Sequence, residues 1–235
     1  MGSNSDFDAY ADDYESALGQ GLAVSGEGRE YFAHGRLAFL RDCLRGRGPA
    51  PAPKTSRVMD FGCGTGTSVP IIKDLLGAET IVGVDESARS IEHAAAHHAA
   101  PGIAFSISEG FVPEANFDLV YTSGVFHHVP VPQRPATFAF LRDVLRPGGV
   151  LAVWENNPWS LPARYVMSRI PFDRDAVMLS ARRVRELARA QGFQVLRTDY
   201  LFIFPASLRV LRPLEAMARR APLGAQYQVL CAKAA

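Results

Sequence analysis

The sequence is poor in several features that mark particular classes of protein. Its three cysteines, Cys43, Cys63 and Cys231, stand far apart and form no CxxC pair, so no disulfide or zinc framework is predicted. No run reaches the roughly 18 apolar residues of a membrane span. The formal net charge is only +1, which gives no overall field toward nucleic acid or an anionic membrane. These absences predict a reduced, cytoplasmic protein with no nucleic-acid partner and no stable membrane insertion.

What the sequence does contain is a regular alternation between about residues 57 and 155. Short apolar runs such as "RVMDFG", "TIVGVD" and "VLAVWE" alternate with segments of helical spacing such as "SARSIEHAAAHHAA". Parallel strands joined by helices produce this rhythm. The hydrophobic content of 48% is enough for a sizeable core. The fold class predicted is α/β, a three-layer sandwich of helices on a largely parallel sheet.

The stretch "DFGCGTG" at residues 60–66 places three glycines directly after the first apolar run. Glycines at a strand end before a helix let the backbone approach a ligand closely. A phosphate-binding P-loop would need a following Gly-Lys pair, which is missing. The spacing is GxGxG, whereas a dinucleotide loop has GxGxxG. S-adenosylmethionine remains, because Asp60 and the loop carbonyls can supply or orient partners for its ammonium group; a simple tight turn also remains open.

A second acidic residue follows about 20 positions later, at the end of the run "TIVGVD". Asp85 there can accept both ribose hydroxyls of a bound nucleoside. The alternative is that Asp85 caps the helix that starts just beyond it. Ser87 is a competent cap by itself, which weakens that alternative.

Four motifs in order, "VMDFGCGTG", "VGVDES", "FDLVYTSGVFHHVP" and "LRPGGVLAVWENNP", resemble those of the class I S-adenosylmethionine-dependent methyltransferases. The resemblance covers about residues 7–200. It implies a Rossmann-like fold with a seven-stranded, mostly parallel sheet and one antiparallel strand near the edge. It also implies a helical lid or cover over residues 1–50, a methyltransferase domain over residues 51–235, and acceptor-side insertions at about 156–180 and 203–222.

The same resemblance assigns residues to the cofactor. The glycine loop would hold the methionine part of the cofactor. The motif "VGVDES" would hold its ribose and adenine, and the ends of the third and fourth strands would supply the other contacts. Tyr14, on the N-terminal helix, would bring an aromatic face to the sulfonium. The cofactor residues implied in this way are Tyr14, Asp60, Phe61, Gly62, Gly64, Asp85, Glu86, Ser87, Glu109, Gly110, Thr122 and Ser123.

Catalytic residues are expected at the strand ends that face the acceptor. His127 is the first candidate for acceptor contact, and Glu155 can orient an acceptor or take its proton. Glu155 could instead cap a helix or pair with an arginine such as Arg164. We do not expect both adjacent histidines to face the site, and a structural role is the simpler interpretation of His128. The candidates on the acceptor side are Tyr10, His34, His128 and Asn156.

The motif "WENNP" is similar to one in bacterial methyltransferases of saccharide, lipid and secondary-metabolite pathways, where Asn156 is commonly His. The expected reaction is O-methylation of a small-molecule acceptor with release of S-adenosylhomocysteine. N-methylation of a small heterocycle or amine is the alternative; a nicotinamide-dependent reductase and a non-catalytic cofactor-binding module are remote ones. No metal is expected, because His93 and His97 are spaced like ligands on a helix but lack an obvious third partner.

Overall fold

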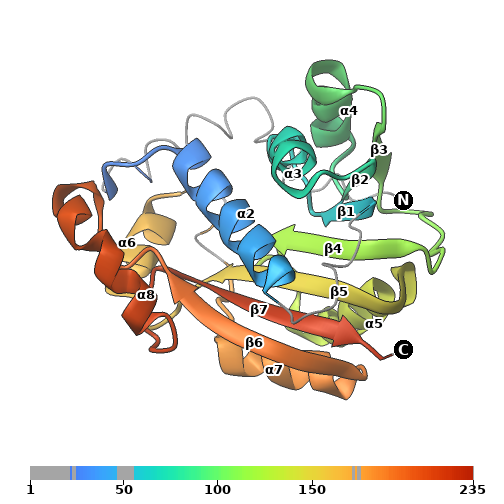
Figure 1. Cartoon of the computed structure of the whole chain (residues 1–235). Coiled ribbons are helices and arrows are strands. Elements are labelled where there is room, and N and C mark those ends of the chain that lie inside the picture. The colour runs from blue at the N-terminus through green and yellow to red at the C-terminus, as the bar shows by residue number, and fades with distance from the viewer. Residues whose placement is uncertain (1–21, 23–24, 47–55, 171–172, 174–175, 235) are drawn as a thin grey trace.

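A computed structural model gives the structure of the chain and describes residues 22, 25–46, 56–170, 173 and 176–234. The predicted tyrosines Tyr10 and Tyr14 therefore lie outside the described residues. The alternation seen in the sequence becomes seven strands in one sheet (Figure 1). The strands are β1 (Arg57–Phe61), β2 (Thr80–Asp85), β3 (Ile103–Ile107), β4 (Phe117–Ser123), β5 (Leu145–Asn156), β6 (Phe193–Leu201) and β7 (Gln226–Lys233).

The order of strands across the sheet is β3-β2-β1-β4-β5-β7-β6. Strands β1 to β5 pair in parallel, whereas β7 runs antiparallel to both of its neighbours, β5 and β6. This confirms the predicted sheet with one antiparallel strand next to an edge. The chain order reverses between β1 and β4, and ligands of open α/β sheets bind beside the carboxyl ends of the strands at such a point.

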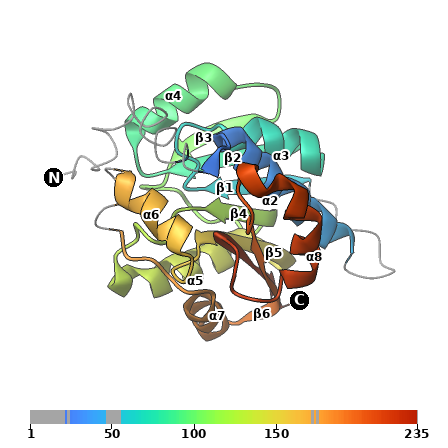
Figure 2. The same cartoon turned by 90° about the vertical axis from the view of Figure 1, so that its left-hand side faces the viewer.

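Helices cover both faces of the sheet (Figures 1 and 2). On one face, α2 (Arg29–Arg45) and α3 (Ser68–Leu76) bury Leu37, Leu40 and Ile72 against the strands, and α4 (Ala88–His98) packs beside them on β2 and β3. On the other face, α5 (Arg134–Val144) and α7 (Ala181–Ala190) bury Phe138 and Val184. The three-layer arrangement predicted from the sequence is therefore present.

The predicted acceptor-side insertions follow β5 and β6 and contain helical segments. The first includes α6 (Leu161–Arg169), which Ser160 caps by accepting a hydrogen bond from the Ala163 amide at 3.3 Å. The basic stretch after β6 forms a 3₁₀ segment, η5 (Ala206–Leu214), and a short α8 (Glu215–Ala218), with Pro213 inside η5. A 3₁₀ turn, η3 (Val131–Gln133), precedes α5. No helix of the described ranges is both long and apolar enough to cross a bilayer.

Candidate functional site

The glycine loop turns sharply out of β1 and is fixed by its neighbours. Gly62 and Gly64 have φ values of 73° and 52°, in the left-handed region that favours glycine. The amides of Gly62 and Cys63 both donate to the Val84 carbonyl, at 2.7 and 3.1 Å. A Cβ on Gly62 would lie 2.2 Å from the Val125 side chain, whereas a Cβ on Gly64 would meet no atom within 4 Å. Gly64 therefore leaves room for a ligand at the strand end.

Asp85 braces this loop from the neighbouring strand. One carboxylate oxygen accepts from the Gly64 amide at 2.8 Å and the other accepts from the Ser87 amide at 3.0 Å. The helix cap of α4 is Ser87 itself, whose hydroxyl accepts from the Ser90 amide at 3.1 Å. The alternative in which Asp85 provides the side-chain cap of α4 is therefore not needed. Its contact with a ribose stays a prediction.

Asp60, the last polar residue of β1, is an acid held in an unusual environment. It is 3% exposed, and its Oδ2 atom has no hydrogen-bond partner within the part of the chain that the structure describes. Burial, reinforced by the nearby Asp85 carboxylate and only partly opposed by Arg36, raises its pKa to about 7. A buried acid without a partner is costly and favours a cationic ligand group beside it. The ammonium of S-adenosylmethionine fits this requirement, and the space beside Gly64 fits its approach to the loop.

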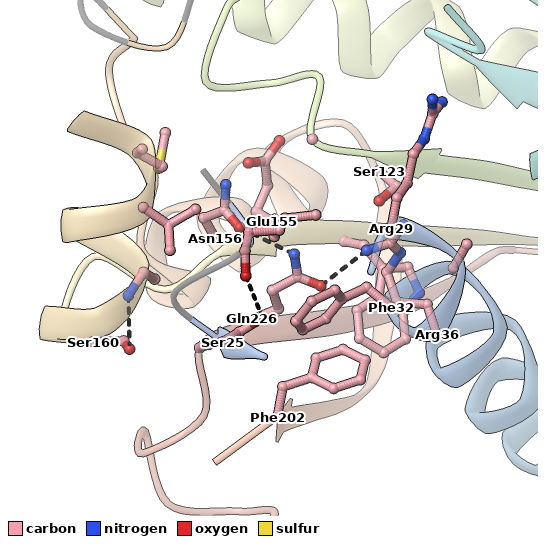
Figure 3. Close-up of a pocket in the computed structure, with 18 of the residues that line it drawn as sticks. Ser25, Arg29, Phe32, Arg36, Ser123, Glu155, Asn156, Ser160, Phe202 and Gln226 are labelled. Carbon is pink, nitrogen blue, oxygen red and sulfur yellow. Dashed lines mark hydrogen bonds between the residues drawn. The ribbon is translucent and has the colours of Figure 1, made fainter. Parts of the chain in front are cut away.

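A cavity of about 650 Å³ extends from the glycine loop past the ends of β4 and β5. Residues of α2, α6 and the segment after β6 also line it (Figure 3). The cavity brings together most of the sequence-predicted residues from those strand ends. The predicted residues among its lining are Asp60, Gly62, Gly64, Ser123, His127, His128, Glu155 and Asn156.

Other predicted residues lie elsewhere in the described structure. Phe61 packs against Phe140 of α5, with ring centroids 5.9 Å apart. Thr122 is buried, and its hydroxyl has no hydrogen-bond partner. His34 is exposed on α2 and does not line the cavity. The remaining residues outside the cavity lining, whose adenosine contacts stay predictions, are Asp85, Glu86, Ser87, Glu109 and Gly110.

A buried histidine–carboxylate pair lines the cavity on the acceptor side. His127 Nδ1 lies 2.7 Å from Glu155 Oε2, and the other oxygen of Glu155 accepts from the Phe126 amide at 2.7 Å. Glu155 thus pairs with His127 rather than with an arginine such as Arg164. Burial alone would lower the pKa of His127, but Glu155 and Asp173 raise it to about 10. With nothing bound, this histidine is therefore an imidazolium at neutral pH, whereas a general base would have to be neutral.

Asp173 joins this group from the segment that follows α6. Its Oδ1 atom lies 3.1 Å from His128 Nε2 and 3.4 Å from His127 Nε2. Both histidines line the cavity, so the expectation that adjacent histidines would not both face the site was wrong. The two rings lie side by side after the chain leaves β4, with their centroids 4.1 Å apart. Asp173 was not predicted, since it lies in a stretch without periodicity or motif.

A polar wall of the cavity comes from α2 and β7 (Figure 3). Arg36 donates to the Tyr121 hydroxyl at 3.2 Å and to Gln226 Oε1 at 3.1 Å. Gln226 in turn donates to Asn156 Oδ1 at 3.1 Å. This chain of hydrogen bonds holds the guanidinium of Arg36 beside the cavity. Arg29 and Arg36 are seven residues apart on one helix, a spacing that could have indicated a common face.

Aromatic rings close the cavity beside this wall. Phe202 packs edge-to-face on Phe32 and Tyr31, with centroids 5.0 and 5.9 Å away. Arg212 stacks over the Tyr31 ring at 4.7 Å and pairs with Glu27 at 2.6 Å. The acceptor side is thus built from α2 and from the segment after β6, which are far apart in sequence.

Comparisons with known proteins bear on the fold and the domain family. The model of a methyltransferase domain family matches residues 58–149. Trans-aconitate 2-methyltransferase of Azoarcus sp. (strain BH72) is 29% identical over 164 residues, which cover 69% of this chain and 62% of that protein. The enzyme of the same name from Rhizobium leguminosarum bv. trifolii is 36% identical over 124 residues, covering 52% of this chain and 46% of that protein.

Among solved structures, a SAM-dependent methyltransferase from Thermotoga maritima superposes with a TM-score of 0.65 at 19% identity, over 97% of this chain and 98% of that one. This likeness shows a common fold. The matched domain, the motif order and the strand order together support a class I S-adenosylmethionine-dependent methyltransferase. The chain spans about half to three fifths of the length of the first two curated relatives.

Proposed function

We propose that this chain transfers the methyl group of S-adenosylmethionine to an oxygen atom of a small carboxylic acid and releases S-adenosylhomocysteine. The observation that carries the proposal is the continuity of the 650 Å³ cavity. Asp60 and Gly64 line it, and so does Arg36, whose charge is near enough to Asp60 to lower the pKa of that acid. A single cavity can therefore hold a cationic donor and an anionic acceptor side by side.

The donor end supplies contacts suited to the methionine part of the cofactor. Asp60 is buried, and its Oδ2 atom has no hydrogen-bond partner among the described residues, so it would bind the ammonium group. Gly64 offers backbone without a side chain, and Asp85 holds the Gly64 amide in place at 2.8 Å. The predicted contacts of Glu86, Ser87, Glu109 and Gly110 with the adenosine complete this half of the proposal.

The acceptor end is suited to a carboxylate. The guanidinium of Arg36 is already oriented by Tyr121 and Gln226, so little side-chain freedom is lost when it binds an anion. The two relatives described above are named for methylation of trans-aconitate, which is an acid. A carboxylic acid with a pKa near 4 is ionised at neutral pH, so its oxygen needs no general base.

The sulfonium of S-adenosylmethionine supplies an already activated methyl group. What the chain contributes is alignment of the acceptor oxygen and exclusion of water by Phe32, Phe202 and α6. Alignment of two reactants can lower a barrier by about 7–11 kcal/mol. Several of the wall residues lie on helices and strands, which makes such alignment feasible.

The test is a methyl-transfer assay with isotopically labelled S-adenosylmethionine and a matched panel of acceptors. The panel pairs di- and tricarboxylates, trans-aconitate included, with amines and phenols of similar size. We expect methyl esters of one or more carboxylates, detected by mass spectrometry, together with S-adenosylhomocysteine in equal amount. Methylated amines without esters would instead establish N-methylation and overturn the acceptor assignment.

A further inference from the structure

The two histidines and Asp173 place three metal-binding atoms together on the acceptor side of the cavity. One ligand atom from each of His127, His128 and Asp173 lies within 4.8 Å of the other two. Asp173 Oδ1 is 3.1 Å from Nε2 of His128 and 3.4 Å from Nε2 of His127. Tetrahedral zinc has bonds of about 2.0–2.1 Å, which place neighbouring ligand atoms about 3.3 Å apart. The two observed separations lie on either side of that value.

Asp173 is poorly explained as a simple hydrogen-bonding residue. It is 8% exposed, and its buried Oδ1 atom lies within ion-pair distance of both imidazoles, although strict hydrogen-bond geometry is met with no group in the described part of the chain. The approach is therefore close in distance but not along an aligned N–H direction. Ligands around a metal have this relation, because each points at the ion rather than at its neighbour. A cation at the centre would satisfy the buried oxygen.

Glu155 completes the pattern from behind His127. Its Oε2 atom lies 2.7 Å from His127 Nδ1, the ring nitrogen opposite to the proposed ligand atom. A carboxylate in this place accepts the Nδ1 proton and leaves Nε2 with a lone pair for a metal. Glu155 is itself fixed by the Phe126 amide at 2.7 Å. Outer partners of this kind are typical of histidine ligands in metal sites.

We propose that His127, His128 and Asp173 bind a divalent transition-metal ion, with zinc as the best fit to two imidazoles and one carboxylate. All three residues line the cavity, so the open coordination position faces the acceptor. There the ion would hold an acceptor oxygen toward the methyl group. This role rests on the proposed function, whereas binding of the ion does not.

The first experiment measures metal binding alone. Metal-free protein is titrated with Zn²⁺ by calorimetry, and with Co²⁺ while its visible absorption is recorded. We expect one ion per chain and the absorption bands of four- or five-coordinate cobalt. Failure of the wild-type protein to bind either ion would overturn the proposal.

Two conservative variants locate the site. Asp173→Asn and His128→Gln should each bind zinc at least about tenfold more weakly, since even outer partners change metal affinity by about 10–100-fold. Unchanged near-ultraviolet circular dichroism and an unchanged affinity for S-adenosylhomocysteine would show that these variants still fold. Zinc affinity equal to that of the wild type in both variants would overturn the proposal.

A matched control comes from the exposed side of α4. His93 and His97 are spaced like metal ligands, and their rings stack with centroids 4.0 Å apart. The double variant His93→Gln/His97→Gln should keep wild-type zinc and cobalt binding. Loss of binding in this variant would place the ion on α4 and contradict the proposed site.

The two proposals can fail separately. Chelated protein that binds S-adenosylhomocysteine and still methylates a carboxylate at the full rate would remove the metal's proposed role and leave the proposed function intact. Stoichiometric zinc binding at the three residues, with no methyl transfer to any acceptor, would leave the proposed metal site intact and remove the proposed function.

Discussion

The two ends of the cavity are built in different ways. The donor end consists of a short loop between β1 and α3 and of one acid from the next strand, all within residues 60–87. The acceptor end takes Arg36 from α2, His127 and Glu155 from the ends of β4 and β5, and Gln226 from β7. One end is local in sequence, and the other gathers residues separated by up to 190 positions.

This contrast has a physical reason. The donor end must meet the same charged nucleoside whatever the acceptor is, and backbone amides and glycines provide such contacts with little dependence on side chains. The acceptor end must recognise a particular molecule, which requires side chains from several directions. Changes at the donor end should therefore abolish binding of the cofactor, whereas changes at the acceptor end should alter selectivity.

The largest effect is expected from Gly64→Ala. Its Cβ would enter the space where the cofactor approaches the loop, since no atom of the described residues lies within 4 Å of that position. Overpacking of about 1–3 kcal/mol predicts a loss of affinity for S-adenosylhomocysteine of up to about a hundredfold. Titration calorimetry measures this loss.

Gly77→Ala is the matched control for that variant. Gly77 also has a left-handed φ, 67°, and open space at its Cβ position, but it ends α3 away from the cavity. Both variants should lose about 1–2 kcal/mol of folding free energy through backbone strain. Equal affinity for S-adenosylhomocysteine in the two variants would contradict the placement of the cofactor at Gly64.

Asp60 should make cofactor binding depend on pH. Its pKa of about 7 means that half of the carboxyl groups are protonated at that pH when no ligand is bound. Binding of the cofactor ammonium requires the ionised form. Affinity for S-adenosylhomocysteine should therefore rise about tenfold per pH unit below 7 and level off above it. Calorimetry between pH 5.5 and 8.5 measures this profile.

Asp60→Asn tests the assignment of that profile. The variant should bind more weakly at pH 8 and lose the dependence below pH 7. The ligand-free wild-type protein should also become less stable as pH rises from about 4 to about 7, because the folded state retains a proton that the unfolded chain releases. A pH profile unchanged in Asp60→Asn would mean that another group controls binding.

Arg36→Gln should affect the acceptor more than the cofactor. Removal of a charge-assisted hydrogen bond costs about 1.5–3 kcal/mol, so the KM of a carboxylate acceptor should rise about tenfold or more. The measurement belongs at pH 8.5, because Arg36 also lowers the pKa of Asp60. A KM that is unchanged, or an equal loss of cofactor affinity, would contradict the division between the two ends.

The smallest effect is expected at His34. The sequence suggested it as an acceptor-side residue, but it is exposed on α2 and does not line the cavity. His34→Ala should change stability by no more than about 0.5 kcal/mol and leave the KM of the acceptor unaltered. A clear rise in KM would show that His34 reaches the acceptor after all.

The difference between the two ends also explains what the sequence could predict. The alternation of apolar runs and helical segments indicated the parallel part of the sheet, the family resemblance gave the number of strands, and the glycine loop with Asp85 indicated the donor end. These signals are local, so a single sequence contains them. The helix α6 lies in a segment for which only an acceptor-side insertion was predicted, and its start is marked by the cap at Ser160 and by Pro162 in the first turn.

The acceptor end could be predicted only in part. Glu155 and Asn156 end β5, His127 lies shortly after β4, and all three were found through their motifs. Arg36 and Gln226 were missed because nothing in the sequence brings α2 next to β7. Asp173 was missed for a related reason, since its position depends on how the chain returns from α6.

The most direct test of the central claim is calorimetry of the wild-type protein at pH 8 with S-adenosylhomocysteine and, separately, with NADH. If the donor end is a methyltransferase cofactor site, S-adenosylhomocysteine should bind with micromolar affinity and one-to-one stoichiometry, and NADH should not bind. Binding of NADH in place of S-adenosylhomocysteine would contradict the account.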